Sequence, residues 1–307
     1  MRIVAFGECM LELSGGFGEG AHLGFGGDTL NTALYLARLG AKVSYATALG
    51  HDSWSQEMRR AWSEEGIALD LVLTDPQRLP GLYAIQTDAG GERRFSYWRT
   101  NSAARHFFEL PGAEQLLRII STADLFYVSG ISLSLYGDAE RARLLDVAYA
   151  VRIHGGDVAF DPNYRPAGWS SPDQARSAFD LFTPAVSVAL PTFEDERLLR
   201  PQLTPETAAR RWLATGAREV ALKLGEAGAL VADEGQIRHV RAVAVSQPID
   251  TTGAGDAFNA GYLFGRSQGQ SPHAAAALGA AIAAKVICHR GGIAPRAATQ
   301  FQPVAHP

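Results

Sequence analysis

The sequence predicts an α/β protein built on a largely parallel sheet with helices on both faces. Two observations carry this prediction. Short apolar runs typical of buried strands alternate with helical patterns along most of the chain. With 307 residues and no repeat, low-complexity tract or linker, the chain has enough core for a single domain spanning residues 1–307.

Strands and helices alternate in a fixed order, and suitable residues mark several helix ends. The predicted strands are residues 3–6, 43–46, 125–128, 158–160, 186–190 and 220–223. The predicted helices are residues 29–39, a segment that begins near residue 53, residues 138–151 and residues 271–287. Gly40 suits a helix C-terminus, Asp52 or Ser53 suits an N-cap, and Pro272 suits a first helical turn.

Residues 82–99 break this alternation and predict a β-hairpin with its turn at residues 88–92. Because side chains alternate along a strand, Phe95, Tyr97 and Arg99 should face the same side. Such a polar and aromatic face is unlike that of a buried core strand.

A small sheet projecting from the core as a lid follows from this hairpin. We expect residues 10–25 and 80–100 to form it, inserted in the α/β core. A solvated edge hairpin is the simpler alternative.

A glycine turn directly before a helix is the most informative feature of the chain. It lies in Asp250-Thr251-Thr252-Gly253-Ala254-Gly255-Asp256-Ala257-Phe258, and the helix is predicted over 257 to about 266. Gly253 and Gly255 let the backbone bend and approach a ligand, and the helix directs its free N–H groups at the same point. This arrangement suits a phosphate, and Asp256 could accept a proton from an attacking hydroxyl. A capped helix after a turn is the alternative for a lone motif of this kind.

A second glycine turn precedes the first helix. Asp28 could cap that helix, or Asp28 and Asn31 could both reach the hydroxyls of a polyol, with Gly26 and Gly27 allowing it to approach the backbone. A dinucleotide-binding motif fits poorly, because the first strand is not followed by a Gly-x-Gly-x-x-Gly turn that opens a helix; the chain has no P-loop either.

Composition narrows the class of protein. A net charge of −4 with 20 % charged residues gives no sign of a nucleic-acid or membrane surface. Cys9 and Cys288 form neither a metal nor a disulfide pattern, and fit a reducing compartment. The first residues lack the apolar core of a signal peptide, and no apolar run is long enough to span a membrane, so we expect a cytoplasmic protein.

Several motifs in the same order resemble the 2-keto-3-deoxygluconate kinase branch of the ribokinase-like (PfkB type) sugar kinases. The motifs are the stretch from Asp250 to Asp256, Gly7-Glu8-Cys9-Met10-Leu11-Glu12-Leu13, Gly26-Gly27-Asp28-Thr29-Leu30-Asn31-Thr32, Leu79-Pro80-Gly81-Leu82-Tyr83, Gly91-Glu92-Arg93 with Tyr97-Trp98-Arg99, and Phe160-Asp161-Pro162-Asn163-Tyr164-Arg165-Pro166. The resemblance runs from about Arg2 to about Arg296. It implies a ribokinase-like, Rossmann-type three-layer core with a small β-sheet lid. It also implies ATP-dependent phosphorylation of 2-dehydro-3-deoxy-D-gluconate to the 6-phosphate, with Mg²⁺.

The resemblance assigns a role to each matching residue. The catalytic set is Asp256 as base, with Gly253, Ala254 and Gly255 as the anion hole. The substrate-binding set is Gly27, Asp28, Asn31, Tyr83, Tyr97, Arg99, Arg165 and Asp256. The nucleotide-binding set is Asn163, Arg165, Lys223, Gly225, Gly228, Gly253 and Gly255, although an exposed lysine at a strand end is the alternative for Lys223. The arginines suit a keto acid because a guanidinium can pair with a carboxylate through two parallel bonds.

The chain departs from the family at the segment related to metal binding. Many relatives have Asn-x-x-Glu there, whereas this chain has Thr192 and Asp195 at the two positions. Since Mg²⁺ is held mainly by phosphates and water, activity should survive, and the metal ligands stay unassigned. Asp250 is a candidate for shaping a monovalent-cation loop, as in some relatives.

Other functions remain open at this point. The nearest is a kinase of the same family that acts on a neutral ketose such as fructose. A catalytically silent sugar- or nucleotide-binding regulator belongs to a different class, and an NAD-dependent oxidoreductase is disfavoured by the missing fingerprint. The expected partners are a small sugar acid and ATP, in a homo-oligomer.

Overall fold

The computed structural model describes residues 1–16, 20–87 and 93–299, and the turn predicted at residues 88–92 lies outside them. The strands of the main sheet are β1 (Ile3–Phe6), β4 (Val43–Leu49), β5 (Val72–Thr74), β8 (Leu125–Ser129), β9 (Asp157–Asp161), β10 (Val188–Ala189), β11 (Glu219–Lys223), β12 (Ala229–Asp233) and β13 (Gln236–Val240). Their order is β13-β12-β11-β10-β9-β8-β1-β4-β5. Pairing is parallel from β11 to β5, and antiparallel from β11 to β13.

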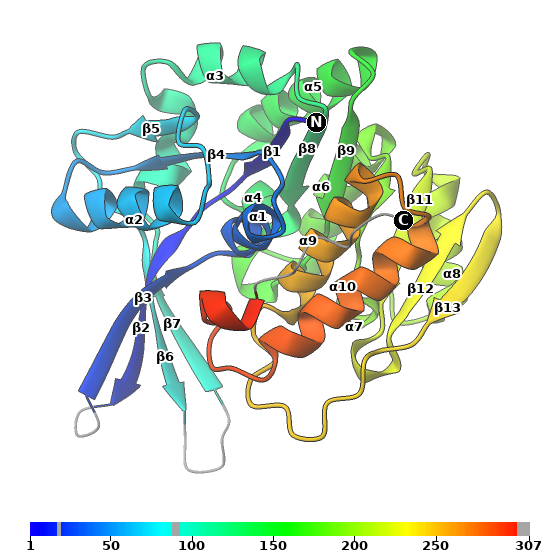
Figure 1. Ribbon diagram of the computed structural model, residues 1–307. Helices are drawn as coiled ribbons and strands as arrows, with labels where there is room; N and C mark the ends of the chain where they lie inside the picture. Colours follow the sequence, from blue (N-terminus) through cyan, green and yellow to red (C-terminus); the bar gives the residue numbers. More distant parts are fainter. Residues whose placement is uncertain (17–19, 88–92, 300–307) are drawn as a thin grey trace.

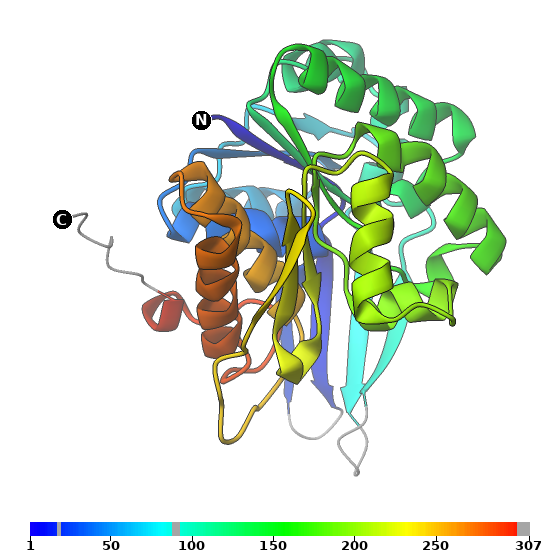
Figure 2. The ribbon, with the colours of Figure 1, turned by 90° about the vertical axis from the view of Figure 1, so that its right-hand side faces the viewer.

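Helices cover both faces of this sheet. One face carries α1 (Asp28–Arg38), α2 (Ser53–Glu64), α9 (Ala254–Ser267) and α10 (Pro272–Val286). The other face carries α3 (Ala113–Ile120), α4 (Gly130–Ser134), α5 (Asp138–Ile153), α6 (Pro172–Phe182), α7 (Phe193–Leu199) and α8 (Pro205–Ala214). Short 3₁₀ helices cover Ala103–Glu109, Pro166–Gly168, Thr183–Ala185, Gly225–Ala227 and Arg296–Thr299. Figure 2 shows the green helices and the orange helices on opposite sides of the sheet.

The core is split into two layers by the alternation of side chains along each strand. On β1, Ile3 and Ala5 pack against the layer of α1 and α9, while Val4 and Phe6 pack against the layer of α3 and α5. A strand buried on both faces must be apolar throughout, which is why the sequence showed apolar runs rather than alternation. The predicted three-layer α/β core is therefore confirmed.

A smaller sheet projects from one end of the core (Figure 1). Its strands are β2 (Met10–Gly16), β3 (Gly20–Gly26), β6 (Leu82–Thr87) and β7 (Arg93–Trp98), in the order β3-β2-β6-β7. Tyr83 pairs with Tyr97 across β6 and β7, and the Phe95 and Tyr97 rings stack with centroids 6.3 Å apart. The predicted second sheet, with Phe95 and Tyr97 on a common face, is confirmed.

Three local predictions need correction. Helix α9 begins at Ala254 rather than 257, because Gly253 with φ 74° already serves as the N-cap. Strand β10 covers only Val188–Ala189 of the predicted 186–190. Asp28 does not cap α1: Gly27 occupies the cap position, and Asp28 is the first helical residue, with its side chain directed to another element. No helix in the described part of the chain is long and apolar enough to span a membrane.

Candidate active site

Several of the predicted site residues lie at the carboxyl ends of the parallel strands, whereas Tyr83, Tyr97 and Arg99 belong to the small sheet. β9 delivers Asp161 and the loop with Asn163, and β11 ends at Lys223. Helices α1 and α9 begin at the same place, with Asp28 and Asp256 in their first turns. Ligands of open parallel sheets bind at this edge, so the topology itself marks the location.

Asp256 is a buried carboxyl group held by one amide. Its side-chain oxygen Oδ2 accepts a hydrogen bond of 2.8 Å from Nδ2 of Asn31, and the residue is 8 % exposed. Burial raises the pKa of Asp256 to about 8; the charge of Asp28 adds to the shift, and the Asn31 hydrogen bond opposes it. A carboxyl group with a pKa near neutrality can accept a proton from a hydroxyl and later release it.

The glycine turn lies immediately beside this carboxyl group. Gly253 adopts φ 74°, and a Cβ there would lie 2.5 Å from the carbonyl oxygen of Gly292. A Cβ on Gly255 would meet only the side chain of Lys223 within 4 Å, the nearest atom being Nζ at 3.8 Å. Gly253 offers no side chain to cap α9, and the Ala254 N–H donates to the carbonyl oxygen of Thr251 at 3.2 Å. The next N–H groups of the first turn, those of Gly255 and Asp256, are therefore the ones suited to an anion.

Asp28 is joined to the loop after β9. Its Oδ2 accepts a hydrogen bond of 2.9 Å from Nδ2 of Asn163, whose φ of 34° places that residue in the left-handed region. Burial raises the pKa of Asp28 as well. A Cβ on Gly27 would lie 2.2 Å from the carbonyl oxygen of Glu8. Gly27 therefore permits close packing of the protein on itself, and not only the approach of a polyol that the sequence suggested.

Lys223 is buried, so its interpretation as an exposed lysine is wrong. Its Nζ donates to Oδ2 of Asp161 at 2.7 Å and to Oδ1 of Asn259 at 2.9 Å. Neither Asp161 nor Asn259 was among the predicted site residues. Asn259 lies three positions after Asp256 on α9, and this helical spacing is a signal that could have identified it.

The two arginines expected to bind a carboxylate are each paired with a carboxylate of the protein. Arg99, just after β7, forms an ion pair with Glu8, whose side chain is 1 % exposed. Nε and Nη2 of Arg99 have no aligned hydrogen-bond acceptor among the described residues, so charge rather than directional bonding holds the pair. Nη1 of Arg165 lies 3.2 Å from both side-chain oxygens of Asp195. Burial raises the pKa of Asp195, and Arg165 opposes the shift.

The two tyrosines of the small sheet differ in exposure. Tyr83 is 9 % exposed and donates its hydroxyl to Glu12, whereas Tyr97 is 49 % exposed. Sequence reasoning missed Glu8 and Glu12 as partners, because each lies far along the chain from the residue it contacts.

The remaining predicted residues shape loops around the site. Gly225 and Gly228 have φ of 59° and 98°, and a Cβ on Gly228 would lie 2.1 Å from the carbonyl oxygen of Val240. Thr192 is the N-cap of α7 without a side-chain cap bond. The carboxylate of Asp250 accepts from the backbone N–H groups of Thr252 and Gly291 at 2.7 and 2.8 Å, which joins two loops next to α9.

No group of three or more acidic, histidine or cysteine side chains that could hold a metal ion occurs in residues 1–16, 20–87 and 93–299.

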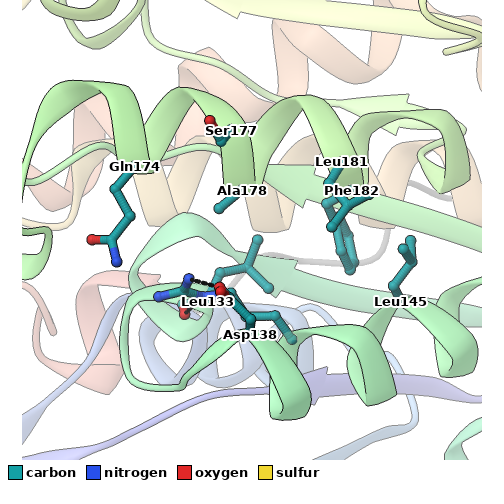
Figure 3. A pocket seen from close by; sticks show the side chains of 9 residues that line it. Leu133, Asp138, Leu145, Gln174, Ser177, Ala178, Leu181 and Phe182 are labelled. Carbon is teal, nitrogen blue, oxygen red and sulfur yellow. Dashed lines mark hydrogen bonds and ion pairs between the residues drawn. The ribbon is translucent and has the colours of Figure 1, made fainter.

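A separate cavity of about 370 Å³ lies between α5 and α6 (Figure 3). Its walls include Leu133, Leu145, Ala178 and Phe182, and Arg141 pairs with Asp138 at its edge. None of the predicted site residues lines it, so it takes no part in the site described above.

Comparison with known proteins identifies the family. The model of the pfkB family of carbohydrate kinases matches residues 2–299. The chain belongs to this family. The ribokinase-like fold that the sequence predicted is confirmed: a PfkB protein from Polaromonas sp. JS666 has a TM-score of 0.84 and 29 % identity, covering 96 % of this chain and 98 % of that one.

The chain is also similar to other known proteins. A 2-dehydro-3-deoxygluconokinase of Dickeya dadantii is 43 % identical over 96 % of this chain and 97 % of its own. A fructokinase of Vibrio alginolyticus is 29 % identical over 78 % of this chain and 75 % of its own. A putative ribokinase II from E. coli, solved with ATP and Mg²⁺, shares the fold with a TM-score of 0.82 and 23 % identity, covering 95 % of this chain and 94 % of that one.

Proposed function

We propose that this pfkB family member transfers the γ-phosphoryl group of ATP to the 6-hydroxyl of 2-dehydro-3-deoxy-D-gluconate, giving the 6-phosphate. The observation that carries the proposal is Asp256, a buried carboxyl group beside an uncapped helix N-terminus. The sequence identity of 43 % to a 2-dehydro-3-deoxygluconokinase supports the choice of sugar acid over a ketose.

The residues present suit this transfer. The 6-hydroxyl would give its proton to Asp256 while its oxygen bonds to the γ-phosphorus and the bond to the β-phosphate oxygen breaks, releasing ADP. The turn from Gly253 to Gly255 supplies backbone N–H groups to the phosphoryl oxygens. Asp28 and Asn31, one helical turn apart on α1, would hold sugar hydroxyls from the core.

The small sheet and its arginine provide the means to select an acid. Arg99 has buried donors without aligned acceptors, and a substrate carboxylate would supply those acceptors. Tyr83 and Tyr97 would contact the sugar from the same sheet, and its closure would exclude water. Arg165, with a side chain 56 % exposed, would reach either the carboxylate or a phosphate.

ATP would lie along the turn that follows β11. Lys223, Gly225 and Gly228 border this place from one side, and Asn163 and Arg165 from the other. Mg²⁺ entering with ATP would reduce the negative charge of the phosphates. We also propose that a monovalent cation binds near Asp250.

We also propose that the protein works in the cytoplasm as a homo-oligomer. Its two cysteines, Cys9 and Cys288, are free, which fits a reducing compartment. Trp98, on the face of the small sheet opposite Phe95 and Tyr97, is 60 % exposed, and a large exposed aromatic side chain there favours contact with a second copy. Sedimentation velocity of the purified protein, with and without Trp98→Glu, tests this assembly; a monomeric wild type would refute it.

A substrate panel tests the reaction itself. Purified protein is given MgATP with 2-dehydro-3-deoxygluconate, its galactonate epimer, gluconate or fructose, and ADP release and the position of the new phosphate are measured. We expect the highest kcat/KM with 2-dehydro-3-deoxygluconate and phosphorylation at the 6-position. A higher kcat/KM with fructose would establish the ketose alternative, and no turnover of any sugar would favour a binding regulator.

A further inference from the structure

A buried polar cluster lies next to the first turn of α9, formed by Lys223, Asp161 and Asn259. These side chains come from β11, β9 and α9, and all three residues are at most 6 % exposed. Lys223 donates to the other two at 2.7 and 2.9 Å, and Asn259 donates to the Asp161 carboxylate at 2.6 Å. Every pair in the cluster is therefore joined directly.

Asn259 is held in one orientation by its own partners. Its amide nitrogen donates to Asp161 and also to the hydroxyl of Tyr127 at 3.1 Å, and its amide oxygen accepts from Lys223. The Thr32 hydroxyl lies 3.3 Å from both the Tyr127 hydroxyl and the backbone oxygen of Asp256, and 3.1 Å from the backbone oxygen of Asp28, and its single proton can go to only one of them. The cluster thus continues to the backbone of the proposed base.

The position of the Lys223 ammonium group says more about its role than its burial does. Nζ of Lys223 is the atom nearest to where a Cβ of Gly255 would be, at 3.8 Å, so it lies alongside the glycine turn. The described contacts use two of its three N–H donors. A lysine kept only to neutralise Asp161 would not need to end beside the turn that faces the phosphates.

We propose that Asp161 and Asn259 are positioning residues that hold the Lys223 ammonium group against the glycine turn, where its charge stabilises the phosphoryl group during transfer. This inference rests on the proposed kinase function. A cation fixed in place beforehand stabilises charge that develops in the transition state, because it needs no reorganisation during the reaction. The two partners replace the water that would otherwise surround the ammonium group.

The alternative is an ion pair that only stabilises the fold. Removing one member of a buried pair leaves an unpaired charge, whereas removing both members together is often neutral for stability. This difference gives a test that separates the two roles. Lys223→Met removes the cation, and Lys223→Met with Asp161→Asn removes the pair while keeping similar side-chain volumes.

The measured quantities are kcat, the KM values of sugar and ATP, and the melting temperature. For Lys223→Met we expect kcat to fall by roughly 10²-fold, the effect of losing one transition-state donor, with little change in the KM of the sugar. In the double variant we expect the melting temperature to recover while kcat stays at the Lys223→Met value. Recovery of kcat together with stability would show that the pair is only structural and would overturn the proposal.

A double-mutant cycle tests Asn259 in the same way. Asn259→Ala should lower kcat in the wild type but have no further effect on kcat in the Lys223→Met background, since it acts through Lys223. Equal losses in both backgrounds would show that Asn259 acts independently and would overturn its assignment as a positioning residue.

Binding of a transition-state mimic provides a second readout. ADP, aluminium fluoride and sugar together imitate the transferring group. Lys223→Met should weaken this complex by a factor close to its loss in kcat, while leaving the affinity for ADP alone nearly unchanged. Equal weakening of both would instead place Lys223 in ground-state nucleotide binding only.

Arg266→Met is the matched control, because Arg266 on α9 also pairs with a buried acid, Glu219 on β11. Its Nε lies 2.7 Å from Glu219, which is 2 % exposed, but at the far end of the helix. It should lower the melting temperature and leave kcat within about twofold of the wild type.

If the sugar-acid proposal fails, the wild type does not turn over that sugar; the same variants can then be assayed with whichever sugar is accepted. Normal kcat in Lys223→Met with such a sugar would refute only the present inference.

Discussion

Asn31 on α1 donates a 2.8 Å hydrogen bond to the carboxylate of Asp256 on α9, although 225 positions separate the two residues in the chain. This bond joins a residue proposed to hold the sugar with the residue proposed to deprotonate it. The first turns of two helices thus meet at a single carboxyl group.

Replacing the proposed base should stop the reaction without unfolding the protein. Asp256→Asn keeps the size of the side chain but cannot take up the proton, so kcat should fall by roughly 10²–10⁴-fold. Gly255→Val should have a similar effect because its side chain would enter the anion site next to Lys223. Circular dichroism checks the fold, and Asp138→Asn, which alters a fully exposed carboxylate, is the control. A folded Asp256→Asn enzyme with nearly full kcat would refute the assignment.

The pH dependence of kcat/KM should report the pKa of about 8 at Asp256. Since the base must be deprotonated, kcat/KM should rise with pH and level off above that value. Asp28→Asn removes a charge that raises this pKa, so the rise should move to lower pH. Asn31→Ala removes a bond that lowers it, so the rise should move to higher pH. Shifts in the same direction in both variants would contradict an electrostatic origin of the raised pKa of Asp256.

The raised pKa also links stability to pH. The folded state keeps a proton on Asp256 up to about pH 8, whereas the unfolded chain releases it near 3.8, so this group stabilises the fold most at low pH. Its contribution should be lost as pH rises from about 4 to about 8. Relative to the wild type, Asp256→Asn should lack this loss, which thermal unfolding at several pH values would measure. An identical pH dependence in both proteins would show that Asp256 does not titrate in this range.

The small sheet should act on the sugar and not on ATP. Tyr97 is 49 % exposed on the face that it shares with Phe95 and Tyr83. Tyr97→Ala should therefore raise the KM of the sugar far more than the KM of ATP. Hydrogen exchange of β6 and β7 should slow when sugar and nucleotide are added; unchanged exchange would count against closure of the sheet.

An arginine that binds the substrate carboxylate should matter only for acidic substrates. Replacing it by lysine keeps the charge but loses the planar fork, so Arg99→Lys or Arg165→Lys should lose much of a bidentate contact worth roughly 1.5–3 kcal/mol. We expect kcat/KM for 2-dehydro-3-deoxygluconate to fall by about one to two decades, with weak turnover of fructose nearly unchanged. Equal losses on both sugars would refute a carboxylate contact, and a raised KM of ATP alone would place Arg165 at the phosphates.

Much of the fold could be predicted because buried parallel strands appear in the sequence as apolar runs. β1 matches its prediction residue for residue, and β11 differs by one residue. The start of α9 could not be predicted from its apolar pattern, since the backbone angle of Gly253 decides it. The pattern of Asp28 allowed both a cap and a ligand, and only the structure, with Gly27 at the N-cap and the Asp28 side chain bonded to Asn163, excludes the cap.

The partners of the site residues could not be predicted from the sequence. Lys223 ends an apolar run, and nothing local shows whether its ammonium group lies in solvent or between Asp161 and Asn259. The pairing of Arg99 with Glu8 depends on how the small sheet meets the core. Such contacts follow from tertiary packing, whereas spacing rules reach only neighbours on one helix or strand.

Strand β3 ends at Gly26 and helix α1 begins at Asp28, so a single residue separates the small sheet from the side chains that meet Asp256. That residue, Gly27, is packed tightly against the backbone of Glu8. If the sheet moves toward a bound sugar, the start of α1 must move with it, because no flexible loop lies between them to absorb the displacement. Binding of the sugar and alignment of Asp256 would then occur together. Without the sugar, the base would not be aligned, so bound ATP would not be hydrolysed.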